Sequence, residues 1–284
     1  MRMVSSAKLH HVQGMTEAFL RYKDELEKIV NTLSHHGEGV QATSSQTTNH
    51  PDSAPHDGGD VRQDREGQRS LLLIPISSNS GLCGAFNSNM VKATFQRIKE
   101  WEAQGAQVQV LPIGKKIAHA LKKEGINFKE DFVNLLETVE KSNTFAKVSS
   151  LVELAVERYQ AKEIDHVEFI YHHFKSMGTQ LIQVDSLQLT THLSPSTAKF
   201  SLLTEPSPEE LLASLFPRLQ NAQVYSILLD SLTSEHAARM LAMQTADDNA
   251  NDLLKELTLL YNKTRQQAIT DELIDIMGGK VVNQ

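Results

Sequence analysis

The most constraining feature of this sequence is a stretch near its C-terminus, residues 218–277, that contains neither proline nor glycine. A helix can begin just before it, because Ser207 is a good capping residue and is followed by a proline and two acids. Pro217 should kink or restart this helix. At about 1.5 Å per residue, a helix from Ser207 to about Gly278 would be roughly 100 Å long. Such a length predicts a coiled coil or a shaft.

The side chains of this helix form a stripe whose chemistry changes along its length. Apolar residues alternate steps of three and four at Met243, Ala246, Ala250, Leu253, Leu257 and Leu260. In the same register, polar residues follow at Thr264, Gln267 and Asp271, before Ile274. The apolar stripe alone indicates ordinary packing, whereas the polar stretch indicates a shaft tip that faces a protein socket.

Residues 1–33 also predict an amphipathic helix, because apolar residues recur there every three or four positions. No capping residue precedes Met1, so we expect residues upstream of it to be missing. The stretch 35–66 is different in kind: its 32 residues include no aromatic side chain, four apolar residues, and six acids against two arginines. This composition has too little apolar surface to offset the entropy of ordering, so we predict a disordered loop.

Residues 70 to about 191 predict a compact α/β domain. Strands are expected at 70–77, 108–114, 166–174 and 180–189, and helices at 85–101, 115–123 and 143–162. Alternating strands and helices predict βαβ units, in which helices cover the faces of a sheet. The last two strands are joined by a short turn at Ser176–Met177–Gly178, which predicts an antiparallel hairpin at the edge of the sheet.

The composition argues against several functional classes. The formal net charge is −7 and no basic patch is visible, so we expect no nucleic-acid partner. The single cysteine, Cys83, cannot form a disulfide framework or a zinc cluster within this chain. No run of about 18 consecutive apolar residues occurs, so we expect no direct membrane insertion.

Candidate catalytic chemistry is weak throughout the sequence. The turn at 81–84, Gly-Leu-Cys-Gly, lies between a strand and a helix, but it lacks the spacing and the lysine of a phosphate-binding loop. Tight backbone turning explains its glycines better. The adjacent histidine pairs would point apart on a helix or strand, and no pair of carboxylates stands out for acid–base work. We therefore expect no catalytic, cofactor-binding or metal-binding residues.

Three stretches resemble the gamma subunit of F-type ATP synthases. The longest, SEHAARMLAMQTADDNANDLLKELTLLYNKTRQQAITDELIDIMGG at 234–279, is similar to the C-terminal helix of that family. LCGAFNSN at 82–89 resembles its Gly-Leu-Cys-Gly turn, and MVSSAKL at 3–9 resembles the middle of its N-terminal helix. The chain departs from the family pattern in starting inside that helix, in the length of the 35–66 loop, and in reading Gly-Gly-Lys at 278–280, where the family usually has Gly-Ala.

The resemblance implies an α/β fold in which the N- and C-terminal helices form a long antiparallel coiled coil and a Rossmann-like α/β domain lies between them. It implies four parts: a coiled-coil helix at 1–34, a low-complexity disordered insertion and connector at 35–69, an α/β foot domain at 70–206, and a long coiled-coil helix at 207–284.

The function implied by the resemblance is that of a central rotor shaft. It would couple proton flow through the membrane ring to ATP synthesis at the catalytic sites of the beta subunits, without being catalytic itself. The implied partners are the alpha and beta subunits, the epsilon subunit and the membrane c-ring. The implied location is peripheral, on the cytoplasmic face of the bacterial inner membrane.

By resemblance, Met1, Glu235 and Arg239 lie level with the acidic lever loop of the beta subunit. Four residues near the tip match those that meet its catch loop: Arg265, Gln266, Thr270 and Glu272. If Met1 lies level with Arg239, the antiparallel partner of 1–33 is roughly 206–239. The apolar stripe from Met243 to Leu260 would then pair with the missing upstream residues. We also expect the 35–66 loop to have no role in transmitting torque.

Two other interpretations remain open at this point. A stand-alone coiled-coil scaffold with an α/β head would share the long helix, but it gives no reason for the SEHAARM and ITDEL strings. A nucleotide-binding α/β enzyme would need a phosphate loop, which residues 77–90 do not supply. Incubation with ATP distinguishes the last class, since a shaft alone should neither bind nor hydrolyse it.

Overall fold

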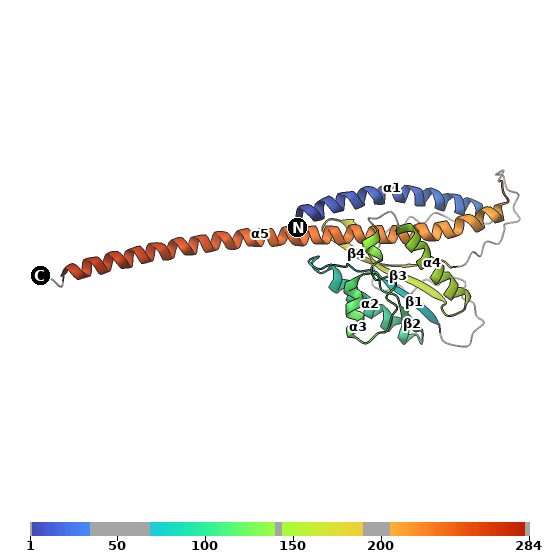
Figure 1. Cartoon of the computed structure of the whole chain (residues 1–284), viewed down its shortest axis with the longest axis horizontal. Coiled ribbons are helices and arrows are strands. Elements are labelled where there is room, and N and C mark those ends of the chain that lie inside the picture. The colour runs from blue at the N-terminus through green and yellow to red at the C-terminus, as the bar shows by residue number, and fades with distance from the viewer. Residues whose placement is uncertain (1, 35–68, 140–143, 190–204, 282–284) are drawn as a thin grey trace.

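The computed structural model describes residues 2–34, 69–139, 144–189 and 205–281. Met1 and the loop predicted at 35–66 lie outside these described residues. Figure 1 shows an elongated molecule in which one helix, α5 (Pro208–Val281), runs past a compact α/β domain and projects far beyond it. None of the helices in the described ranges is long and apolar enough to cross a membrane.

The α/β domain is built on a four-stranded sheet in the order β2-β1-β3-β4. Its strands are β1 (Ser70–Pro75), β2 (Gln107–Val110), β3 (His166–Ser176) and β4 (Thr179–Ser186). β1 pairs in parallel with β2 and β3, whereas β3 and β4 form an antiparallel hairpin at the edge. This confirms the predicted hairpin.

Helices cover both faces of the sheet, which is why β1 is an unbroken apolar run that is buried along its whole length. Leu71 and Leu73 face α2 (Phe86–Ala103) and α3 (Lys115–Lys123). The alternate residues Leu72 and Ile74 face α4 (Thr144–Gln160) and α5. A short 3-10 helix at Leu135–Thr138 was not predicted from the sequence, because four residues carry too little periodicity to detect.

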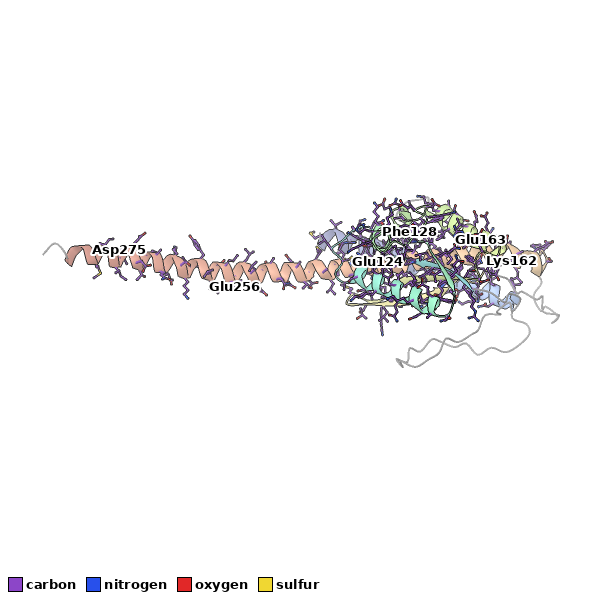
Figure 2. The ribbon with its side chains drawn as sticks, turned by 90° about the horizontal axis from the view of Figure 1, so that it is seen from below. Glu124, Phe128, Lys162, Glu163, Glu256 and Asp275 are labelled. Atoms are coloured by element: carbon purple, nitrogen blue, oxygen red, sulfur yellow. The ribbon has the colours of Figure 1, made fainter. Side chains whose placement is uncertain are left out.

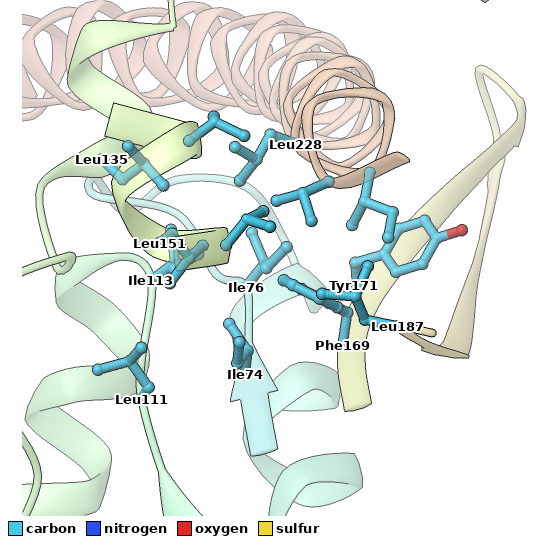
Figure 3. Close-up of a cluster of buried hydrophobic side chains, with 14 of the residues drawn as sticks. Ile74, Ile76, Leu111, Ile113, Leu135, Leu151, Phe169, Tyr171, Leu187 and Leu228 are labelled. Carbon is cyan, nitrogen blue, oxygen red and sulfur yellow. The ribbon is translucent and has the colours of Figure 1, made fainter. Parts of the chain in front are cut away.

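The main hydrophobic core joins the long helix to the sheet. Figure 3 shows Leu228 of α5 facing the cluster that includes Ile76, Ile113 and Phe169. All four side chains are buried, and each large apolar side chain contributes about 1.5–3 kcal/mol when fully removed from water. The shaft and the domain therefore share one core.

The N-terminal helix, α1 (Arg2–Ser34), lies antiparallel to α5, as Figure 1 shows. Leu9 packs with Ala237 and Met240 near one end, and the hydroxyls of Thr16 and Thr233 are 3.4 Å apart further along. At the other end, Val30 and Leu33 pack with Leu212. This pairing confirms the predicted antiparallel coiled coil.

The start of α5 agrees with the sequence, but Pro217 does not divide it. The backbone N–H of Glu210 donates to Ser207 Oγ over 3.3 Å, which is the expected cap. Pro217 lies inside a single continuous helix, so the predicted restart does not occur, whereas the alternative, a kink, stays a prediction. A proline removes one backbone hydrogen bond, and here α5 is held on both sides of that position by contacts with α1 and with the domain core.

Candidate functional site

The projecting part of α5 offers a long surface for other proteins. Every residue from 244 to 277 is exposed, and the large apolar side chains among them are 48–72% exposed. Monomeric soluble proteins rarely leave a contiguous apolar surface of this kind uncovered. The projecting helix is therefore a candidate contact surface.

The four predicted tip residues all lie on this exposed surface. Arg265 and Glu272 are seven positions apart, so they lie on nearly the same side of the helix, and Gln266 and Thr270 form a neighbouring pair. Thr270 donates its hydroxyl to the carbonyl of Gln266 over 2.9 Å, which keeps that side chain close to the helix. These residues present a charged and polar surface near the end of the shaft.

The predicted contact residues Glu235 and Arg239 are placed quite differently. Their side chains are only 8% and 11% exposed, and Arg239 Nη2 donates to Glu235 Oε1 over 2.7 Å. Arg239 also donates to Ser80 Oγ over 2.8 Å and to the carbonyl of Gly81 over 3.3 Å. In this chain Arg239 is thus directed at the domain, and the third residue of that predicted set, Met1, lies outside the described residues.

The turn at 81–84 now has a structural role. Leu82 and Gly84 have φ angles of 64° and 57°, which is the left-handed region where glycine is favoured. This tight turn presents the Gly81 carbonyl to Arg239, while Cys83 and Phe86 pack on Ala238 of α5. The positive φ of Gly84 explains the glycine at that position.

A second pair of joining residues, Asp230 and Ser234, lies on α5. Sequence patterns gave no sign of Asp230, and Ser234 appeared only as the first residue of the SEHAARM string, with no role assigned to it. Asp230 Oδ2 lies 2.6 Å from His173 Nδ1, and Asp230 Oδ1 accepts from the backbone N–H of Phe174 over 2.8 Å. Ser234 is fully buried and donates its hydroxyl to the carbonyl of His172 over 2.9 Å. In the sequence these are ordinary polar residues of a long helix, and only the partner strand distinguishes them.

A buried histidine lies at the same joint. His172 is 2% exposed and stacks on Phe86, with ring centroids 4.0 Å apart. Burial lowers the pKa of His172 from 6.5 to about 4, because the surrounding apolar groups do not stabilise the charged imidazolium.

We expect this histidine to make the domain sensitive to acid. In the unfolded chain His172 binds a proton below about pH 6.5, whereas in the folded chain it does so only below about pH 4. The free energy of unfolding therefore decreases as pH falls between those values. Between about pH 7.5 and about pH 5 the free energy of unfolding should fall by about 2 kcal/mol. Urea unfolding at both pH values should show a smaller loss in His172→Phe. The exposed His119→Gln should behave like the wild type, and an unchanged pH dependence in His172→Phe would contradict this assignment.

Known proteins resemble this chain in both sequence and fold. A family model described as ATP synthase matches residues 1–281. The ATP synthase gamma chain of Parabacteroides distasonis is 43% identical over 286 residues, covering 100% of this chain and 92% of the relative. That of Bacteroides thetaiotaomicron is 37% identical, covering 99% of this chain and 92% of the relative.

Two solved structures share the fold. The central stalk and c-ring structure of the Tetrahymena thermophila mitochondrial ATP synthase matches with a TM-score of 0.54 at 20% identity, covering 87% of this chain and 97% of that chain. The structure of the Euglena gracilis mitochondrial ATP synthase in rotational state 3 matches with a TM-score of 0.53 at 19% identity, covering 98% and 95%.

Proposed function

The chain belongs to the ATP synthase gamma-chain family, and from this membership we propose how its parts divide the work of a rotor shaft. It is the central rotor shaft subunit of an F-type ATP synthase and a component of that enzyme complex. The stand-alone scaffold is not favoured, because the family match extends over residues 1–281.

We infer that the chain carries no catalytic site and that ATP is made or hydrolysed on the beta subunits. The observation that supports this division best is the projecting helix, whose residues 244–277 are all exposed on one continuous element. Figure 2 shows this helix standing clear of the domain, with Glu256 and Asp275 along its length. A ring of alpha and beta subunits around it would cover the apolar surface.

We further infer that the α/β domain, proposed at 70–206, is the foot that meets the epsilon subunit and the membrane c-ring. This arrangement places the protein at the membrane only through partners, on the cytoplasmic face. The tip residues Arg265, Gln266, Thr270 and Glu272 would then contact the beta subunits. An exposed guanidinium suits this contact, because it can form paired hydrogen bonds with a carboxylate.

Reconstitution tests this proposal directly. The purified chain should co-elute with alpha and beta subunits and should raise their ATP turnover, whereas the chain alone should hydrolyse no ATP. In the double variant Arg265→Ala/Glu272→Ala, the concentration needed for half-maximal stimulation should rise about tenfold, since the few interface residues that carry most of the binding energy, often arginines, each cost more than about 1 kcal/mol when truncated.

A matched control lies outside the helix segment that the ring would cover. Lys28 and Glu25 form a surface pair on α1 whose side chains are 68% and 69% exposed, so Lys28→Ala should leave stimulation within about twofold of the wild type. Wild-type stimulation by the double variant would exclude the proposed tip contacts. A wild-type chain that neither co-elutes nor stimulates would contradict the proposed contact with alpha and beta subunits.

A further inference from the structure

The strand β3 continues beyond its parallel neighbour, and the long helix takes the place that the neighbour leaves. The register of β1 with β3 ends at Pro75 and Ile170, and the last bond on that side runs from the Ile76 N–H to the Ile170 carbonyl. β3 itself continues to Ser176. Backbone groups on this edge of β3 past Ile170 therefore need other partners.

Side chains of α5 supply those partners. Ser234 donates to the carbonyl of His172, and Asp230 accepts from the N–H of Phe174. Residues 170, 172 and 174 alternate along the strand, so their backbone groups face the same edge. Asp230 and Ser234 thus extend the hydrogen-bonding edge of the sheet onto the shaft.

The Asp230 carboxylate forms a stronger connection than a single neutral bond. Both of its oxygens are used, one by the Phe174 N–H and the other by His173 Nδ1, and its side chain is 19% exposed. The roles in the His173–Asp230 pair depend on the imidazole tautomer, and with the proton on Nδ1 the His173 ring donates to the carboxylate. Bonds to an ionised acceptor are roughly twice as strong as neutral ones.

The helix is also held from its other side. Arg239 follows Asp230 by nine residues, which places its Cα about half a turn around the helix axis. Its guanidinium donates to Ser80 and Gly81 of the turn that follows β1. Rotation of α5 within the domain would therefore break directional bonds on two sides.

This arrangement has a mechanical consequence. Apolar packing is non-directional, so the shared core resists separation of helix and sheet more than it resists sliding or rotation. Hydrogen bonds weaken steeply when their geometry is distorted, so they oppose a twist. We propose that Asp230 and Ser234 are positioning residues that lock the shaft to the foot domain against rotation, so that torque passes between them. This inference rests on the proposed function.

The test compares ATP hydrolysis with proton pumping in the complete enzyme in membrane vesicles. Asp230→Ala and Ser234→Ala should leave hydrolysis by the soluble alpha–beta–shaft assembly within about twofold of the wild type. Protons pumped per ATP hydrolysed in vesicles should fall by about twofold or more, because each variant loses directional hydrogen bonds across the joint, and those lost in Asp230→Ala involve a carboxylate. Asp230→Asn keeps an acceptor for the Phe174 N–H and should show an intermediate loss.

Asp185 provides the matched control. Its carboxylate accepts from the Tyr171 hydroxyl over 2.8 Å, within the β3–β4 hairpin, and so it bonds inside the domain without reaching α5. Asp185→Ala should keep the wild-type pumping ratio. An unchanged ratio in both Asp230→Ala and Ser234→Ala would overturn the proposal, as would an equal fall in Asp185→Ala. Failure of the wild-type chain to assemble would instead refute the proposed function.

Discussion

Replacing Gly114 by alanine should unfold the α/β domain at a much lower urea concentration than the wild type requires. Gly114 has a φ of 105°, which side chains rarely adopt, and a Cβ there would lie 2.2 Å from the backbone oxygen of Ser77. Ser77 cannot move away, because it is buried and its hydroxyl accepts from the Ile117 N–H at the start of α3. Backbone strain and overpacking together should cost about 3–5 kcal/mol, a large part of a typical domain's stability.

The fluorescence of Trp101, the single tryptophan, reports unfolding of this domain. Gly105→Ala is the matched control, since Gly105 also has a positive φ, of 78°, but nothing lies within 4 Å of its added Cβ. The Gly105→Ala variant should lose only about 1 kcal/mol of its free energy of unfolding. If Gly114→Ala unfolded no more easily than Gly105→Ala, the close contact with Ser77 would not govern stability at this position.

Replacing Arg97 by leucine should also destabilise the domain strongly. Arg97 Nε and Nη2 donate to the two oxygens of Glu168 over 2.8 and 2.7 Å, and Trp101 Nε1 donates to the same carboxylate over 3.2 Å. The hydrogen bond to Glu168 raises the pKa of Arg97 above its ordinary value, so the guanidinium remains charged. Glu168 is 6% exposed, and without Arg97 its charge would be buried with one donor, at a cost of about 3 kcal/mol.

The double variant Arg97→Leu/Glu168→Leu should recover most of this loss, because a buried ion pair replaced by apolar groups is often neutral in stability. Urea unfolding followed by circular dichroism avoids any direct change to Trp101. Lys28→Ala, which removes a surface pair with Glu25 whose side chains are 68% and 69% exposed, should change stability by less than about 0.5 kcal/mol. If Arg97→Leu lost no more stability than Lys28→Ala, Glu168 would not need the Arg97 guanidinium to remain buried.

The secondary structure was predictable because its signals are local. The predicted helix at 115–123 matches α3 in both bounds, and the hairpin was indicated by two apolar runs flanking a glycine-containing turn. The long helix followed from the absence of proline and glycine between 218 and 277. At Pro217 the predicted restart of the helix does not occur, because the continuity of α5 there depends on packing that the local sequence does not encode.

The role of the tip residues stays a prediction, although their exposure agrees with it. The beta-subunit contact of Glu235 and Arg239 also stays a prediction. The burial of this charge pair could not be predicted, because the same letters describe an exposed pair and a buried one. The family motif identified both residues, and in this structure Arg239 donates to Glu235 and also to Ser80 and Gly81 of the domain.

The sequence by itself therefore determined the family, the long helix, the antiparallel pairing and the exposed polar tip. Only the tertiary structure decided how the shaft is held, through Arg239 bonded to Gly81 and Asp230 bonded to β3, as well as the burial of His172. The physical reason is sequence distance: Arg239 and Gly81 are 158 residues apart in the chain, and Asp230 and Phe174 are 56 apart. Periodicity describes which face of an element is buried, but the choice of hydrogen-bond partner depends on which segments the folded chain brings together.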